Sequence, residues 1–306
     1  MTAPDRNRAR DGFVLGFAAY AMWGAFPLYW PLLEPAGAVE LLAHRVAWSA
    51  LVMAVLAVAL RKREGLARVV RDRRVLLLLL AAACVISVNW GVYIWSVNHE
   101  HVVDASLGYF INPLVTVLMG VLVLDERLRT LQWAALAVAG GAVVWLTLAE
   151  GRAPYIALTL AFSFGTYGLL RKKADVGAVE GLTVETFLLA PLAVAYLVWL
   201  QASRDGRAFS EGPGHFGLLA TAGLVTALPL LCFGGAATRV PLTTLGLLQY
   251  VAPTLQFVLG TTVGGESMSV SRWVGFAVIW AALVLFSLDS VRSRRQSRLV
   301  VEASAA

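Results

Sequence analysis

LGYFINPLVTVLMGVLVLDE at 107–126 and LLQYVAPTLQFVLGTTVGGE at 247–266 are the two stretches that decide the fold. An offset of 140 residues aligns them without a gap, and the matched pairs are Pro113 with Pro253, Gly120 with Gly260, Glu126 with Glu266 and, beyond the stretches, Trp133 with Trp273. Both stretches are apolar over about the length that crosses a bilayer. Four coincidences at one offset therefore indicate an internal repeat built from membrane spans.

The composition of the whole chain agrees with a membrane protein. Of 306 residues, 59% are hydrophobic and only 14% are charged, whereas about 25% of the residues in a typical soluble domain are charged. So few charges exclude a soluble enzyme of this size, and so apolar a chain is not intrinsically disordered. The loops left between apolar runs are too short to hold a separate folded domain.

Ten apolar runs are long enough to cross a bilayer. Each is expected to be a helix, because a single segment in lipid must satisfy its own backbone hydrogen bonds. The predicted spans are 12–33, 39–60, 75–97, 104–124, 130–149, 153–170, 180–200, 215–236, 241–263 and 272–290. Because each half holds five spans, the second half enters the membrane from the opposite face. We therefore expect an all-α integral membrane protein with a tail at 1–11, inverted five-helix repeats at 12–149 and 150–290, and a tail at 291–306.

The basic residues orient these spans. With the N-terminus placed in the cytoplasm, 20 of the 25 Lys and Arg residues lie on the cytoplasmic side, 4 lie on the other side, and Arg45 lies within a span. This bias predicts that both termini are cytoplasmic. It also explains the net charge of +6 without a nucleic-acid partner.

Specific segments resemble a known family. ELLAHRVAWS at 40–49, NWGVYIWSVN at 89–98, ASLGYFINPLVTVLMGVLVLDERL at 105–128 and LVTALPLLCFGGAATRVPLTTLGLLQYVAPTLQF at 224–257 resemble RarD-type permeases, in the EamA branch of the drug/metabolite transporter superfamily. The resemblance covers roughly residues 12–290. It implies a ten-helix carrier of the bacterial inner membrane with a central cavity between two inverted halves, but it does not name the substrate.

Polar and aromatic residues at helical spacing are the candidates for the wall of that cavity. Asn89 and Tyr93 share one face of the third span with Ser96, and the fourth, ninth, first and sixth spans carry similar stripes. The remaining candidates in these stripes are Tyr20, Trp23, Ser106, Tyr109, Asn112, Tyr167, Gln249, Tyr250 and Gln256. Such residues either line a cavity or bond helix to helix, and the sequence leaves both interpretations open.

Two charged residues lie inside predicted spans, where a charge is expensive. Arg45 and Glu185 differ by 140 in number, so they occupy equivalent positions in spans two and seven. They either pair with each other, or face substrate, or extend toward the membrane surface. His44 beside Arg45 is a further cavity candidate that can titrate near neutral pH, although a structural role is also open.

Pro113 and Pro253 are predicted to kink their spans and to free the carbonyls of Tyr109 and Gln249. A freed carbonyl can bind substrate or serve as a hinge, and a static kink is the alternative. Glu126 and Glu266 end their spans just before the next helix. We expect each carboxylate to stabilise the positive N-terminus of the helix that follows it.

No cofactor or metal site is indicated. Gly212, Gly214 and Gly217 spell GxGxxG, but Pro213 interrupts the motif and no strand precedes it. His99 and His101 lack metal-binding spacing, and Cys84 and Cys232 have no CxxC partner. The small-residue pair Gly12 and Gly16 leaves the oligomeric state unknown.

The function predicted from these features is secondary transport of a small-molecule substrate within a lipid bilayer, by alternating access between the halves. No Walker motif is present, so ATP is not expected to drive it. Export is favoured. Import and uncoupled facilitation remain open, as does proton coupling through Glu185, Asp104 or His44. An intramembrane enzyme or a membrane sensor is a remote alternative, because the spans show no catalytic cluster and the loops hold no output domain.

Overall fold

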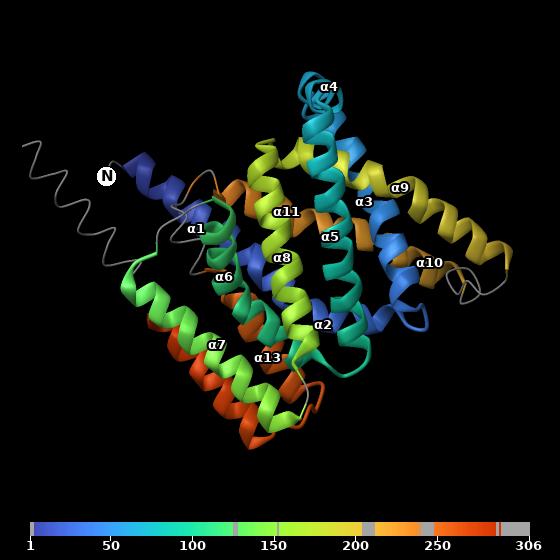
Figure 1. Cartoon of the computed structure of the whole chain (residues 1–306). Coiled ribbons are helices and arrows are strands. Elements are labelled where there is room, and N and C mark those ends of the chain that lie inside the picture. The colour runs from blue at the N-terminus through green and yellow to red at the C-terminus, as the bar shows by residue number, and fades with distance from the viewer. Residues whose placement is uncertain are drawn as a thin grey trace, which may run out of the picture.

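The computed structural model describes residues 3–124, 128–151, 153–203, 212–237, 239, 248–285 and 288. These residues form helices joined by short turns (Figure 1). The helices are α1 (Ala3–Gly24), α2 (Phe26–Tyr29), η1 (Trp30–Leu33), α3 (Ala38–Ala59), α4 (Arg63–Arg71), α5 (Arg73–Asn98), α6 (Val102–Leu124), α7 (Thr130–Glu150), α8 (Tyr155–Ala174), α9 (Ala178–Ala202), α10 (Pro213–Ala220), α11 (Ala222–Ala237), α13 (Val251–Thr262) and an apolar helix at Val270–Leu285.

Helix boundaries follow local sequence signals. Asp72 caps α5, since its carboxylate accepts hydrogen bonds from the backbone N–H groups of Arg74 and Val75 at 2.9 and 3.1 Å. At the other end of a helix, Asp175 follows α8 in the left-handed conformation at φ 49°. Polar residues thus mark where the long apolar helices begin and end.

Among the described residues, six helices are long and apolar enough to cross a membrane, and a bent pair formed by α1 with α2 and η1 raises the number to seven. Large apolar side chains such as Leu148, Leu192 and Val270 are more than two-thirds exposed on the outer faces of their helices. In water such a surface would aggregate, whereas in a bilayer it faces lipid. The chain is therefore a multi-pass membrane protein.

One predicted span differs from the structure because it is bent at a break. The span expected at 12–33 breaks at Ala25, where the axis bends by 44°, and Pro27 and Pro31 follow in α2 and η1. Proline explains the break, because it removes backbone donors and fixes φ. The span expected at 215–236 is formed by α10 and α11, which meet at Thr221 and together make one helix long enough to cross a membrane, Pro213–Phe233.

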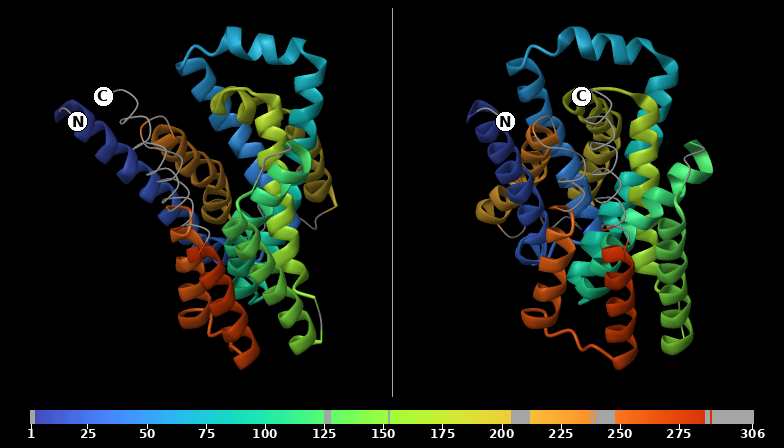
Figure 2. Two further views of the ribbon diagram at one scale, coloured as in Figure 1. Left: turned by 60° about the vertical axis from the view of Figure 1, so that its left-hand side comes forward. Right: turned by 90° about the vertical axis from the view of Figure 1, so that its left-hand side faces the viewer.

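The helices bring the two halves of the sequence together. α5 and α6 both pack along α8, α3 packs along α9, and α1 packs along α11. α4 lies across one end of the molecule, at which α1 also begins, whereas the turns after α7 and α13 lie at the opposite end (Figure 2). Residues of the first half are therefore buried mainly against helices of the second half.

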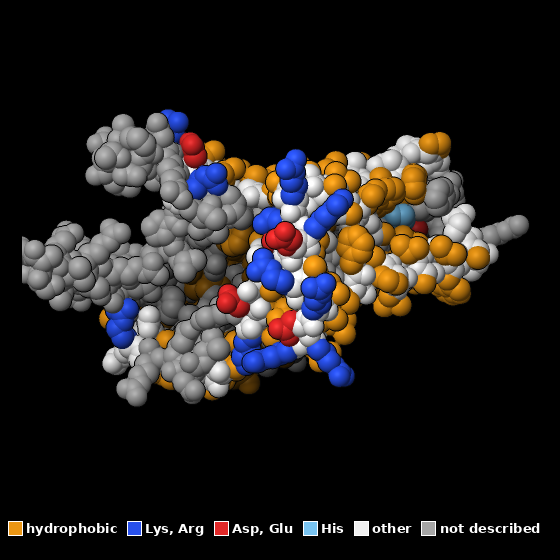
Figure 3. Space-filling view, turned by 90° about the horizontal axis from the view of Figure 1, so that it is seen from above, with side chains coloured by type: hydrophobic (Ala, Val, Ile, Leu, Met, Phe, Trp, Pro, Cys, Tyr) orange, Lys and Arg blue, Asp and Glu red, His pale blue; other side chains and the backbone are white. Residues whose placement is uncertain are grey.

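The end that carries α4 is basic. Seen from that end, Lys and Arg side chains gather over α4 and the adjoining helix ends (Figure 3). They include the exposed residues Arg63, Arg68, Arg71, Arg73 and Arg74. The four residues Leu66, Val69, Leu78 and Leu79 beneath them belong to a small apolar cluster that α4 shares with α5.

Two glycines allow the closest helix crossings. A Cβ atom on Gly108 of α6 would lie 2.7 Å from the carbonyl oxygen of Ala157 in α8. A Cβ atom on Gly223 of α11 would lie 2.6 Å from the carbonyl carbon of Trp48 in α3. The backbones of the two halves approach each other at both places because no side chain intervenes.

Candidate functional site

Arg45 lies in a cage of aromatic rings. Its side chain projects from the second turn of α3 and is only 3% exposed. The guanidinium carbon lies 4.0 Å from the ring centre of Trp90, 5.2 Å from that of Trp30 and 5.8 Å from that of Phe26. A guanidinium over aromatic faces is held by cation–π attraction, which is stronger away from water.

The break in the first span supplies two walls of this cage. Because the chain bends at Ala25, α2 and η1 turn Phe26 and Trp30 inward, where their rings meet edge to face at 5.5 Å. Both side chains are buried. A straight helix through this region would not place these two rings in this way over Arg45. The third wall, Trp90, comes from α5.

Three tyrosines also lie near this charge. Tyr29, Tyr93 and Tyr109 are the ionisable groups that act electrostatically on Arg45, and no carboxylate of the described residues pairs with it. The rings of Tyr93 and Tyr109 meet edge to face at 5.6 Å. The predicted candidates Arg45, Tyr93 and Tyr109 are therefore neighbours.

Asn89 joins the two halves instead of standing free. Its amide nitrogen donates to the carbonyl of Leu160 at 3.0 Å and to Ser163 Oγ at 2.9 Å, both in α8. The Tyr109 hydroxyl donates to Asn89 Oδ1 at 3.3 Å. These contacts have the character of interhelical bonds.

Two other candidates from the fourth span bond within their own helix. Ser106 is fully buried and donates to the carbonyl of Val103 at 2.8 Å. Asn112 is also buried, and its Oδ1 accepts a bond from Thr116 at 3.4 Å. Neither contact extends to another helix.

Glu185 has a partner of its own. Glu185 Oε1 lies 3.1 Å from Arg171 Nη1, and Tyr167 donates its hydroxyl proton to Glu185 Oε2 at 3.2 Å. This cluster joins α8 to α9 and is separate from the Arg45 cage. The sequence did not identify Arg171 as the counter-ion.

His44 precedes Arg45 in the sequence and is also buried, but its side chain packs against Phe216. Its ring lies 6.3 Å from that of Phe216 in α10, and neither ring nitrogen has a hydrogen-bond partner among the described residues. Phe216 also meets Trp48 at 5.8 Å. His44 thus packs in an aromatic contact between α3 and α10.

The candidates of the first and ninth spans meet around Trp23. Tyr20 lies 5.2 Å from Trp23, ring to ring, and Gln256 Nε2 donates to the Trp23 carbonyl at 3.1 Å. Gln256 is buried, whereas Gln249 and Tyr250 are half-buried and precede α13. Tyr250 packs against the core between α6 and α13.

The two prolines do not occupy equivalent places. Pro113 lies inside α6, as expected for a kink. Pro253 lies in the first turn of α13, where a backbone N–H would have no intrahelical partner in any case. Residues 241–247 of the expected span lie outside the described residues, so the interruption of this span by Pro253 and the free Gln249 carbonyl stay predictions.

Glu266 caps a helix, but a different one from the helix predicted. Its carboxylate oxygens accept hydrogen bonds from the backbone N–H groups of Val102 and Val103, at the start of α6. Glu126, its partner in the repeat, lies outside the described residues. Glu266 does stabilise a helix N-terminus, as expected. The helix is α6 of the first half, however, and not the helix that follows Glu266 in the sequence.

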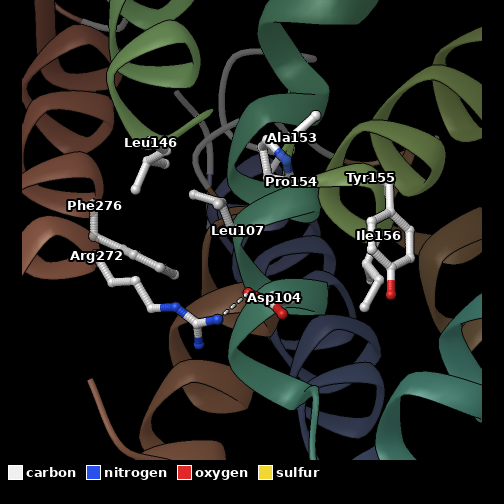
Figure 4. Close-up of a pocket in the computed structure, with 9 residues that line it drawn as sticks. All are labelled: Asp104, Leu107, Leu146, Ala153, Pro154, Tyr155, Ile156, Arg272 and Phe276. Atoms are coloured by element: carbon white, nitrogen blue, oxygen red, sulfur yellow. Dashed lines mark ion pairs between the residues drawn. The ribbon is translucent and has the colours of Figure 1, made fainter. Parts of the chain in front are cut away.

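A small pocket lies beside this contact. Figure 4 shows Asp104 and Arg272 facing each other across it, with Arg272 Nη2 at 3.6 Å from Asp104 Oδ1. Leu107, Tyr155 and Phe276 are among the residues that line it. Asp104 was predicted only as a proton site, and its pairing with Arg272 could not be inferred from spacing.

Metal ligands do not cluster anywhere in the described part of the chain. Cys84 is exposed and Cys232 is half-buried, and both are free thiols.

Comparison with known proteins identifies relatives along the whole chain. The EamA-like transporter family matches residues 10–148 and, a second time, residues 152–288. "Protein RarD" of Streptomyces exfoliatus is 54% identical over 98% of this chain and 95% of the relative. "Protein RarD" of Escherichia coli (strain K12) is 42% identical over 96% and 99%, respectively.

A more distant relative is the "Chloramphenicol-sensitive protein RarD" of Pseudomonas aeruginosa, which is 34% identical over 94% of this chain and 97% of its own. A solved structure titled "Crystal structure of protein" superposes with a TM-score of 0.54, covering 92% of this chain and 98% of that one. At 18% identity, that likeness concerns the fold alone.

Proposed function

Since this chain belongs to the EamA-like transporter family and is a RarD-type permease, we propose that it is a secondary carrier that exports small organic molecules across the bacterial inner membrane. The single observation that carries the proposal is the double match to the family, at 10–148 and 152–288. One transporter repeat in each half is the pattern of carriers that alternate access to a central site.

Ten spans in two inverted halves are part of the proposal. The long helices and the bent first span account for up to seven of them. α8, α13 and the helix Val270–Leu285 supply the other three, because each runs within the same bundle and contributes to its buried core. The 140-residue offset in sequence and the contacts of α5 and α6 with α8 support two interlocked halves.

The basic end seen in Figure 3 is assigned to the cytoplasm. α1 begins at that end, which agrees with a cytoplasmic N-terminus. The opposite end then faces the periplasm and carries the two contacts that join the halves there, Asp104 with Arg272 and Glu266 with the start of α6.

Alternating access requires these outer contacts to separate during the cycle. Two cysteines, Asp104→Cys and Arg272→Cys, in a background lacking Cys84 and Cys232, would allow a cleavable bifunctional thiol reagent to join the halves. Crosslinking is expected to stop transport, and cleavage of the reagent is expected to restore it. Undiminished transport by the crosslinked protein would contradict the mechanism.

The direction of transport can be tested without knowing the substrate. Cells that overproduce the protein are compared with cells that produce the crosslinkable variant, and small molecules in the medium are profiled by mass spectrometry. Export predicts that particular compounds accumulate outside wild-type cells, whereas import predicts their depletion. Identical profiles at equal protein abundance would contradict transport of cellular metabolites.

A further inference from the structure

Arg45 has no counter-ion among the described residues, unlike the carboxylates Glu185 and Glu180. Glu185 pairs with Arg171, and Glu180 pairs with Lys62 at 3.1 Å. Arg45 is more deeply buried than either cation of those pairs, yet it forms no ion pair with any described residue. A buried cation without a counter-ion is unusual in a folded protein, and within a membrane span it indicates a functional site.

The aromatic cage satisfies the faces of the guanidinium but not its edge. Trp90, Trp30 and Phe26 contact Arg45 through their rings, and a ring face accepts a cation without accepting a directed hydrogen bond at the guanidinium edge. The guanidinium carries five N–H donors in one plane, and Nε has no partner among the described residues. The group that fits this planar set of donors is an oxyanion.

Neighbouring side chains add donors to the same place. Trp30 Nε1 is buried and has no hydrogen-bond partner in the described structure, and the buried Tyr93 hydroxyl faces the side-chain amide of Gln256. An indole N–H can only donate, and a hydroxyl can donate to a carboxylate or phosphate. No carboxylate of the described residues forms an ion pair with Arg45. The site is rich in donors and cationic.

The second half reaches this site through Gln256. Its Nε2 donates to the Trp23 carbonyl at 3.1 Å, and its amide lies next to the Tyr93 hydroxyl. The site therefore combines the broken first span, α3 and α5 with α13 of the other half. Broken helices and a junction between repeats are the usual surroundings of a transported ligand.

We propose that Arg45 and its aromatic cage bind the charged end of the transported molecule, and that this molecule is a small organic oxyanion bearing a carboxylate or a phosphate. The rings hold the guanidinium in place and shield it from lipid. The oxyanion takes the in-plane donors, with Trp30 and Tyr93 contributing further hydrogen bonds. This inference rests on the proposed transport function and specifies its substrate class.

The test uses liposomes containing the purified full-length protein, loaded with compounds that share a skeleton and differ in charge. One series is pentanedioate, pentyl phosphate, pentanediamide and 1,5-diaminopentane, and a second series has the same groups on benzene. Mass spectrometry follows the loss of each compound. Wild-type protein is expected to release the carboxylates and phosphates at least tenfold faster than protein-free liposomes, and the amides and amines no faster.

Arg45→Gln is expected to slow release of the anions at least tenfold, and Arg45→Lys is expected to retain part of it because the charge remains. Arg71→Gln is the matched control, since Arg71 is exposed on α4 and should behave as wild type. If Arg45→Gln does not fold, the charge selectivity of the wild-type protein still decides the question, and Arg45→Lys supplies the variant.

Two outcomes overturn the inference in distinguishable ways. Release of amides or amines in preference to anions, with or without Arg45, would leave the proposed transport function intact and make Arg45 a structural clamp. Release of no compound by folded wild-type protein would contradict the transport function itself, and the inference with it. Anion release that depends on Arg45 supports both.

Discussion

Arg171 Nη1 lies 3.1 Å from Glu185 Oε1, so a residue at the end of α8 neutralises a carboxylate buried in α9. The two side chains differ in exposure: that of Glu185 is 3% exposed and that of Arg171 is 18% exposed. Arg171 can therefore reach water if its partner is lost, whereas Glu185 cannot. The pair is asymmetric, and its two halves should respond differently to substitution.

Arg171→Gln is expected to destabilise the protein by about 3–5 kcal/mol, because it strands a buried carboxylate. Glu185→Gln should cost less, since the released Arg171 is partly hydrated. The double variant should resemble Glu185→Gln alone. Reversible unfolding in mixed micelles measures the differences, and equal losses for the two single variants would contradict this asymmetry.

A second prediction concerns Arg45 and Glu185, which the repeat places at equivalent positions. Among the described residues no ion pair joins them, and each has separate neighbours. Arg45→Glu combined with Glu185→Arg is therefore expected not to restore the abundance or transport lost in the single variants. Mutual rescue of the two reversals, measured by membrane abundance and efflux, would show that they interact after all.

The sequence located most helices well because apolar runs bounded by charges leave little choice of boundary. The span expected at 39–60 is α3 at Ala38–Ala59, and that expected at 130–149 is α7 at Thr130–Glu150. Lipid excludes unpaired backbone groups, so an apolar run of this length is a helix whatever its neighbours.

The interior was less predictable, since it depends on which helices meet. Trp90 was not among the candidates because they were chosen from stripes of polar residues. It is nevertheless the ring nearest to Arg45. Polar residues such as Asn89 were found, but periodicity could not distinguish a cavity wall from the bonds that Asn89 makes to α8.

The close crossing of α6 and α8 gives a third prediction. Gly108→Ala would place a methyl group 2.7 Å from the Ala157 carbonyl oxygen, so the helices must separate. We expect a loss of about 1–3 kcal/mol from overpacking. Gly140→Ala in α7 is the matched control, because nothing lies within 4 Å of its Cβ position. Unfolding temperatures in detergent should fall for the first variant only, and equal temperatures would contradict the close contact.

The orientation of the chain gives a fourth prediction. Reporter fusions after Arg68 and after Lys173 are expected to report the cytoplasm, and a fusion after Ser203 is expected to report the periplasm. The reason is the distribution of basic residues, 20 of which lie on one side in the ten-span arrangement. A cytoplasmic signal after Ser203, or a periplasmic one after Arg68, would require a different number of spans.

The last prediction concerns Glu266, which lies in the turn after α13 and caps α6. Burial raises the pKa of its carboxyl group above the ordinary value. The backbone N–H groups of Val103 and Val102 act in the opposite direction, while Asp104 raises the pKa and Arg272 lowers it. The net shift is upward, so the folded protein holds the Glu266 proton to a higher pH than the unfolded chain does.

This shift fixes the sign of a pH effect. The stability that Glu266 contributes is fully present below its unfolded pKa, near 4.5, and is lost as pH rises through the higher pKa of the folded state. Glu266→Gln cannot ionise and should lack this decline. The unfolding free energy of wild type minus that of the variant is therefore expected to fall as the pH rises above the ordinary carboxyl pKa, near 4.5. A difference that rises with pH would mean that the two N–H bonds and Arg272 outweigh burial.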